Sequence, residues 1–484
     1  MKNQSCSKKA SAISPSKVVI DLSTRATSLK SIFANVADIE QPVPNAVTSD
    51  MCVRSVHVPS AVPVTWLDPS LPYVAIYNEL NAPFSPTLPA ATFYTITESG
   101  HAALEHATED LHSMFVRATE YVLENEADVG KYFHIPDVLW PKIRRSWAQR
   151  YAHVVRDCRH AYRCHALPCS KHDVVSGRFD FALTNEGIKV YEYNADSASC
   201  LLECGYVQDA WAAAAGVASV GRSTSATLFQ QLVQTWKDLK ISGPLHIMCD
   251  RDIEERYHAT YMQAAAEAAG IRCYLVVGID GITWTLDNQG LQDGAGHRIV
   301  NVWKTWCWRT VMNEVEAREE ATASFQVPDA PQLMDILLHE SVRVFEPLWT
   351  LLAGSKAILP ILSKLFPHSP YLLKSSFDER DVAEFTTGYV AKPVMGRTGS
   401  NISLYSADRQ LLNETGGRWV RDTIVYQELA MLPKYNDAMY VQVNTWAIHG
   451  AFGGTVLRQD ASSIIGLNSD IPLLRVVPDA DDNN

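Results

Sequence analysis

Apolar residues recur at helical spacing in one long segment of the chain. From residue 99 onward they stand at Leu104, Leu111, Phe115, Ala118 and Val122, with polar residues between them. Apolar positions three or four residues apart place one continuous stripe on a helix. The pattern therefore predicts a long amphipathic helix with one buried face.

Alternating residues predict a β-hairpin further along. The stretch RFDFAL is followed by the turn-forming TNEG and then by KVYEYN. Residues i and i+2 of a strand point to the same face. Arg178 and Asp180 are therefore expected on one face of the first strand, and Glu192 and Asn194 on one face of the second. If the strands pair, the four polar side chains form one cluster.

A third pattern predicts a strand, a helix and a strand. PLHIMCD, YHATYMQAAAEAAG and CYLVV follow one another, which indicates a Rossmann-like unit. No G-x-G-x-x-G follows the first strand, so nothing indicates a dinucleotide. We expect a mixed α/β fold with a disordered leader at 1–65, a first part with the hairpin at 66–240, the Rossmann-like part at 241–340 and a nucleotide-binding part at 341–484.

Composition limits the classes of partner. The 484 residues are 47% apolar, and 42 basic against 54 acidic residues give a net charge of −12. This balance argues against nucleic acid, which needs a basic surface, and it is compatible with a cationic substrate. No apolar run reaches the 18 residues of a membrane span, so we expect no membrane association.

Cysteines and the N-terminal segment bear on location. The ten cysteines lack regular spacing, which favours free thiols and a cytoplasmic protein. The Ser- and Lys-rich leader is poor in arginine, so a mitochondrial presequence is the less favoured alternative. Cys158, Cys164 and Cys169 lie among histidines within 156–173. Their spacing matches no zinc motif, and we favour an exposed loop insertion over a zinc site.

The hairpin cluster suits a magnesium ion. Mg²⁺ prefers oxygen ligands, usually carboxylates together with phosphate oxygens of a nucleotide. Asp180, Glu192 and Asn194 offer two carboxylates and an amide oxygen. The alternative is a polar strand end whose side chains are solvated.

Downstream motifs favour a nucleotide site. The stretch YVAKPVMGRTGSN places Lys392 at a strand end and then Arg397 in a glycine-bracketed loop. Glycines let backbone N–H groups approach phosphate oxygens, and arginine adds charge-assisted contacts. Lys356 supplies a second cation, and the strand IVYQELAML could present the backbone of residues 427–429 to an adenine. No Walker A motif is present. These are the parts of an ATP-grasp site.

Long motifs resemble the glutathionylspermidine synthetase family. They include LWPKIRRSW, GRFDFAL, KVYEYNADSASC, DIEERYHA, VWKTWCW, YVAKPVMGRTGSN and FGGTVLR, in order over roughly residues 66–477. The resemblance implies an ATP-grasp-like fold with a Rossmann-like pre-ATP-grasp substrate domain. Glu192 precedes Lys356 by about 160 residues, the reverse of ordinary ATP-grasp chains, so the implied connectivity is permuted.

The resemblance also implies an activity and residue roles. ATP would phosphorylate the glycine carboxylate of glutathione, and an amine of spermidine would attack the acyl phosphate. Mg²⁺ would be held by Asp180, Glu192 and Asn194. The implied catalytic residues are Arg178, facing the acyl phosphate, and Arg397, in a mobile lid. The implied ATP contacts are Lys356, Lys392, Gly399, Gln427, Glu428 and Leu429. The implied substrate contacts are Ser197, Ser199, Cys200, Glu254, Glu255 and Thr305.

Two of these assignments carry alternatives. Glu254 and Glu255 supply the carboxylates that a polyamine needs, or they are a solvated helix start. Cys200 has no identifiable histidine partner, and acyl-phosphate chemistry needs no thiol nucleophile. We therefore expect Cys200 to line the site, where its thiol could form a mixed disulfide with glutathione.

Departures from the family leave other functions open. About 65 residues precede the resemblance, too few for the amidase domain of bacterial relatives, so product hydrolysis is not expected. Arg309 follows VWKTWCW where an acid is expected, which could alter substrate choice. The alternatives are a related acid–amine ligase with another acid or amine, and an inactive nucleotide- or polyamine-binding protein. A homodimer is one option for the assembly.

Overall fold

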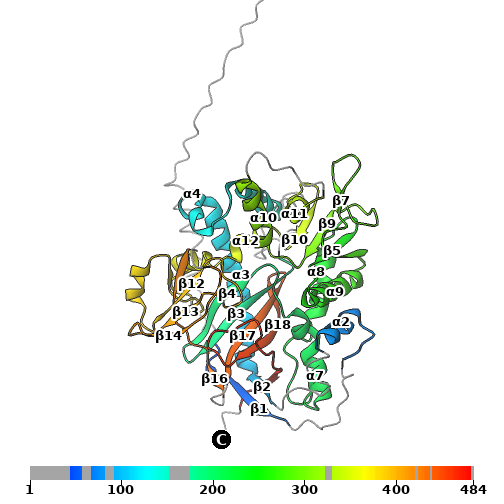
Figure 1. Ribbon diagram of the computed structural model, residues 1–484. Coiled ribbons are helices and arrows are strands. Elements are labelled where there is room, and N and C mark those ends of the chain that lie inside the picture. The colour runs from blue at the N-terminus through cyan, green and yellow to red at the C-terminus, as the bar shows by residue number, and fades with distance from the viewer. Residues whose placement is uncertain are drawn as a thin grey trace, which may run out of the picture. The chain divides into compact units, whose positions relative to one another are not determined.

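The protein is a mixed α/β molecule built on several sheets (Figure 1). The computed structural model describes residues 44–56, 67–81, 92–151, 174–321, 330–419, 423–435 and 439–480. Residues 44–484 form one compact unit. The expected α/β class is confirmed.

The central sheet is antiparallel and contains the predicted hairpin. Its strands are β3 (Ser176–Thr184), β4 (Gly187–Asn194), β16 (Lys434–Tyr435), β17 (Met439–Ile448) and β18 (Ala451–Asp460). Strand β17 pairs with β3 and β18, and β4 pairs with the other edge of β3. Arg178 lies opposite Asn194, and Asp180 lies opposite Glu192, so the predicted cluster is confirmed.

The opposite face of the hairpin packs on the predicted long helix. Helix α3 (Glu98–Glu124) begins where the Thr97 side chain accepts a hydrogen bond from the Gly100 N–H, and its apolar stripe is buried. The Phe115 ring lies 5.5 Å from Phe179, which stacks at 4.0 Å on Tyr193. Strand alternation thus sends aromatic residues to the core and polar residues to the other face.

The predicted Rossmann-like unit forms a parallel sheet. Its order is β10 (Arg343–Phe345), β9 (Asn301–Lys304), β5 (Leu245–Cys249) and β6 (Cys273–Val277). Helix α9 (Ile253–Ala268) connects β5 to β6, as the sequence predicts. A two-stranded ribbon of β7 (Thr283–Trp284) and β8 (Leu291–Gln292) follows.

A third sheet carries the predicted lysine strand. It is antiparallel, in the order β11 (Ser375–Ser376), β15 (Ile424–Glu428), β12 (Tyr389–Pro393), β13 (Ser403–Tyr405) and β14 (Leu411–Glu414). The glycine-bracketed loop joins β12 to β13 and therefore leaves the end of the strand that carries Lys392.

Part of the predicted leader is ordered, so that prediction was wrong for the residues the structure describes. Strand β1 (Met51–Ser55) pairs with β2 (Thr92–Thr97), which also pairs with β19 (Leu474–Val477). Met51 is buried because it packs into the main core, an interaction that composition does not reveal. Residues 1–43 lie outside the described residues.

The other predicted boundaries remain predictions. The central sheet joins strands from the parts predicted at 66–240 and 341–484. Strand β10, from the part predicted at 341–484, extends the parallel sheet of the Rossmann-like part. The remaining helices are α2 (Pro72–Asn81), α4 (Glu126–Val129), α5 (Trp140–Tyr151), α7 (Gln208–Ala214), α8 (Leu228–Asp238), α10 (Trp308–Glu320), α11 (Leu333–Leu337), α12 (Thr350–Ala353) and α13 (Ile358–Leu365). Shorter helical turns are η1 (Thr48–Asp50), η3 (Gly130–Phe133), η4 (Asp137–Leu139), η6 (Glu203–Val207) and η7 (Glu379–Glu384).

Candidate active site

A cavity of about 890 Å³ brings most of the predicted site residues together. Its walls come from the hairpin, the loop after β4, the start of α9, the third sheet and the loop after β18. The predicted residues that line it are Arg178, Asp180, Glu192, Asn194, Ser197, Ser199, Cys200, Glu254, Lys356, Lys392, Arg397, Gly399, Gln427 and Leu429.

The β3 side of the cavity holds a buried ion pair. Arg178 Nε and Nη2 donate to the two carboxylate oxygens of Asp180 at 2.8 and 3.1 Å. The Arg178 Nη1 atom donates to the Ser199 carbonyl at 2.8 Å, and Asn444 Nδ2 donates to Asp180 Oδ1 at 2.7 Å. Planar two-point pairing fixes the guanidinium toward the loop that carries Ser199.

Glu192 and Lys356 meet although the chain separates them widely. Lys356 Nζ lies 2.8 Å from Glu192 Oε2 and donates to the Gly396 carbonyl at 2.7 Å. Burial raises the pKa of Glu192, but the cations of Lys356, Lys392 and Arg178 together outweigh it and the pKa falls to about 2. The fold therefore brings these two residues together despite their reversed order in the sequence.

Lys392 is buried beside this pair. Its Nζ donates to Gln427 Oε1 at 2.6 Å and to the Tyr191 carbonyl at 3.2 Å. Burial lowers the pKa of Lys392 to about 7, because the charged form loses its hydration. Tyr191 is the extra residue of a β-bulge, since Glu192 pairs with Asp180 while Val190 pairs with Phe181.

The glycine-bracketed loop carries Arg397 at the cavity. Thr398 and Gly399 have positive φ values of 51° and 73°, and a Cβ on Gly399 would lie 2.8 Å from the Ile465 carbonyl oxygen. Position 399 therefore favours glycine both by conformation and by close approach. Arg397 lines the cavity and is exposed.

The loop after β4 presents the predicted serines. Ser197 and Cys200 have positive φ values of 54° and 73°, and the Ser197 hydroxyl donates to the Thr305 carbonyl. Burial raises the pKa of Cys200 to about 11, so the thiol is protonated at neutral pH. This supports a lining role for Cys200 over a nucleophilic one.

Three predicted residues do not line the large cavity. Glu255 and Thr305 line a separate space of about 30 Å³ behind the serine loop. Glu428 points away, and its carboxylate accepts hydrogen bonds from Thr386. The N–H groups of Glu428 and Leu429 donate to the carbonyls of Lys374 and Gly388, so these donors are already used within the protein.

The structure adds cavity residues that sequence reasoning missed. Gln442, Arg458 and Glu203 line the cavity. Arg458 donates to Ser469 Oγ at 2.8 Å and to the Gly466 carbonyl at 2.7 Å, which ties the loop after β18 to the cavity wall. Glu203 lies three residues beyond KVYEYNADSASC. The one sequence signal that could have indicated it is the change there from a polar stretch to apolar residues.

The sequence also singled out Arg309 and the Cys- and His-rich segment at 156–173. Arg309 does line the cavity, and its guanidinium contacts Met395 Sδ at 3.5 Å and lies 3.5 Å from Glu316. The cysteines and histidines between 156 and 173 all lie outside the described residues. Within the residues that are described, no cluster of three or more His, Cys, Asp or Glu could hold a metal ion.

Comparison with known proteins shows the family. Residues 82–159 and 169–472 match the model of the family described as glutathionylspermidine synthase preATP-grasp, and the chain belongs to this family. The gap in the match falls within the predicted insertion at 156–173.

Three curated relatives are similar over most of this chain. The bifunctional glutathionylspermidine synthetase/amidase of Escherichia coli is 40% identical over 85% of this chain and 63% of its own length. The trypanothione synthetase of Crithidia fasciculata is 32% identical over 88% of this chain and 63% of its own. The glutathionylspermidine synthase of the same organism is 30% identical over 80% of this chain and 59% of its own length. This chain therefore spans about three fifths of the length of each.

Among the helices of the described residues, none combines the length and the apolar character that crossing a bilayer requires.

Proposed function

We propose that this chain is an ATP-dependent C–N ligase that joins the glycine carboxylate of glutathione to an amine of spermidine. Family membership and the ligase names of the three relatives support the proposal. The observation that carries it is the cavity in which Arg178, the Glu192–Lys356 pair and Lys392 converge. The six free cysteines of the described residues support a cytoplasmic location.

The first step forms an acyl phosphate. A carboxylate oxygen of glutathione attacks the γ-phosphorus of ATP, an O–P bond forms, and ADP leaves with the electrons of the broken bond. Catalysis of such a transfer rests on positioning and on charge neutralisation. Lys356 and Lys392 would hold the phosphates, Arg178 would face the acyl phosphate, and Arg397 would cover the transferring group from its loop.

The hairpin oxygens fit a magnesium ion. Asp180 and Glu192 offer carboxylates in register and Asn194 adds an amide oxygen, the hard donors that Mg²⁺ prefers. Among the described residues, the buried side-chain oxygens of Gln442 and Asn444 have no hydrogen-bond donor, so the oxygen excess suits a cation. The ion would neutralise phosphate charge. Arg178 and Lys356 form ion pairs with the two carboxylates.

The second step forms the amide. The nitrogen of a neutral amine attacks the acyl carbon, a C–N bond forms, the C–O bond to phosphate breaks, and the nitrogen releases one proton. Glu203 and Glu254 line one wall of the cavity, which we call the acidic wall. Carboxylates at this wall would hold the ammonium groups of a polyamine, with Glu255 behind them.

An ADP-release assay tests the proposal. Purified protein with Mg²⁺, ATP, glutathione and spermidine is expected to release ADP and amide in equal amounts, and omission of either the acid or the amine should stop continued turnover. The matched control is Glu186→Gln, because Glu186 lies in the exposed hairpin turn outside the cavity. ATP binding without ADP release for any acid–amine pair would instead support an inactive binding protein.

One observation favours the second candidate, a ligase for a different acid or amine. Arg309 adds a cation to the cavity where the family resemblance predicts an acid. Screening other peptides and diamines in the same assay distinguishes the candidates, since the better substrate pair will have the higher kcat/KM.

A further inference from the structure

The acidic wall contains one carboxylate that is held in place from behind. Glu203 is buried, and its Oε1 accepts a hydrogen bond from the Tyr257 hydroxyl at 2.7 Å. Its Oε2 lies 3.4 Å from Nε2 of His258, which is also buried. Glu254 lines the same wall, and its carboxylate sits in the first turn of α9. Glu203 is thus restrained by two partners on α9.

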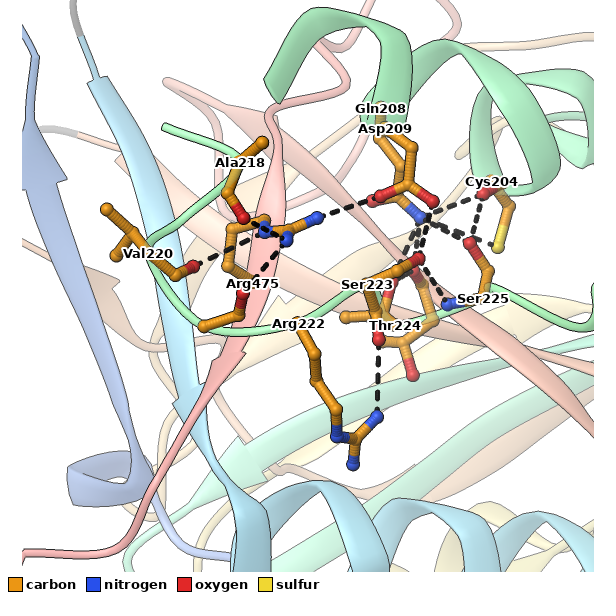
Figure 2. A network of polar contacts seen from close by, with 12 residues as sticks. Cys204, Gln208, Asp209, Ala218, Val220, Arg222, Ser223, Thr224, Ser225 and Arg475 are labelled. Carbon is orange, nitrogen blue, oxygen red and sulfur yellow. Dashed lines mark hydrogen bonds and ion pairs between the residues drawn. The ribbon is translucent and has the colours of Figure 1, made fainter. Parts of the chain in front are cut away.

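The backbone that carries Glu203 is fixed by a buried polar network (Figure 2). Glu203 begins the π-helical turn η6, and the next residue, Cys204, accepts a hydrogen bond from the Ser225 hydroxyl through its carbonyl. Gln208 Nε2 donates to Thr224 Oγ1 and Ser225 Oγ at 3.0 and 3.1 Å. Because the backbone is held on this side, the position of the Glu203 carboxylate depends on Tyr257 and His258.

The charges around His258 are mainly negative. On its own helix it faces Glu254 and Glu255, and on η6 it faces Glu203. The small cavity that it lines also contains Lys304 and Glu346. The nearby thiol of Cys200 and phenol of Tyr77 have pKa values raised by burial, so they are neutral at physiological pH. Burial lowers the pKa of His258, but the three carboxylates outweigh it and the net shift is upward.

We propose that His258 is a positioning residue for the amine substrate: it holds Glu203 at the cavity wall and offsets part of the negative charge that the amine meets. The inference rests on the proposed function for the identity of the amine. It adds a residue that does not touch the large cavity yet controls a carboxylate that does.

The sign of the pH effect follows from charge. Protonated His258 cancels part of the attraction between the acidic wall and a cationic amine. As pH rises through the raised pKa of His258, the ring loses its charge and the amine should bind more tightly. Linkage makes this coupling reciprocal, and couplings of this kind typically change affinity by about fivefold or more.

Calorimetric binding of spermidine tests the inference without turnover. His258→Gln keeps an amide donor beside Glu203 and removes the titration. At about pH 6 this variant is expected to bind spermidine about fivefold more tightly than wild type, and the difference should shrink as the pH rises through the raised pKa of His258. Glu254 and Glu255 titrate in both proteins, so the comparison isolates the histidine. A gain in affinity at low pH is a result that a folding defect cannot produce.

Two further variants complete the design. His297→Gln is the matched control, since His297 Nδ1 lies 3.0 Å from Asp293 Oδ2 in a pair outside the large cavity, and its affinity should follow wild type at both pH values. His258→Phe also lacks the charge but removes the contact with Glu203, and it should bind spermidine more weakly than His258→Gln at both pH values. Equal affinity of wild type and His258→Gln at pH 6, weaker binding by His258→Gln, or no spermidine binding at all overturns the inference. Failure of ADP release alone overturns only the proposed ligase activity.

Discussion

Nucleotide binding is expected to take up nearly one proton at about pH 8, and Lys392 is the acceptor. Its ammonium is buried between Gln427 and the Tyr191 carbonyl, and burial lowers its pKa to about 7. The Lys356 ammonium adds to this lowering, while the Glu192 carboxylate opposes it. Phosphate oxygens brought against Lys392 favour the charged form and move the pKa back toward its ordinary value.

The magnitude follows from these two states. With a pKa of about 7, Lys392 is charged in roughly one molecule in ten at about pH 8, whereas with an ordinary lysine pKa near 10.4 it is almost fully charged. Binding should therefore take up about 0.9 proton at about pH 8. At about pH 6 Lys392 is already mostly protonated in the free protein, and uptake should fall to about 0.1 proton.

Calorimetry in buffers of different ionisation enthalpy measures this uptake. Lys392→Met should abolish it, and it should also weaken nucleotide binding. Lys189→Met is the matched control, because Lys189 donates to the Pro370 carbonyl outside the cavity and should leave the uptake unchanged. The reasoning is refuted if uptake is the same at both pH values, or if it persists in Lys392→Met.

Three further predictions concern single side chains. Glu192→Ala and Asn194→Ala should each abolish ADP release while circular dichroism and melting temperature change little, since both side chains are only partly buried at the cavity wall; normal turnover in either variant would exclude the magnesium role. Arg397→Ala should lower kcat about 100-fold, equivalent to roughly 3 kcal/mol, with little change in ATP affinity, because the exposed arginine acts as charge develops; a change confined to KM for ATP would contradict this. Asp180→Ala should lower the free energy of unfolding by about 3 kcal/mol, because it leaves the buried charge of Arg178 unpaired; an unchanged melting curve would show that the pair is structurally unimportant.

The local sequence pattern was sufficient to predict the helices and strands that carry the candidate site. Strand alternation predicted that Arg178, Asp180, Glu192 and Asn194 share one face, and helical spacing predicted the buried stripe of α3. Both signals are short-range, because side-chain direction is fixed by backbone geometry within a few residues. The strand–helix–strand unit around α9 was predicted for the same reason.

Contacts between distant segments were decided only by the tertiary structure. Lys356 lies in the turn between α12 and α13, and it reaches Glu192 because these two helices pack on α3, which covers the hairpin. Met51 is buried because β1 pairs with β2. The pairing of Glu203 with Tyr257 and His258 likewise joins two helices that no local pattern links. Sequence thus determined which residue types could perform the chemistry, while long-range packing decided which of them meet, because burial and electrostatic environment depend on neighbours far away along the chain.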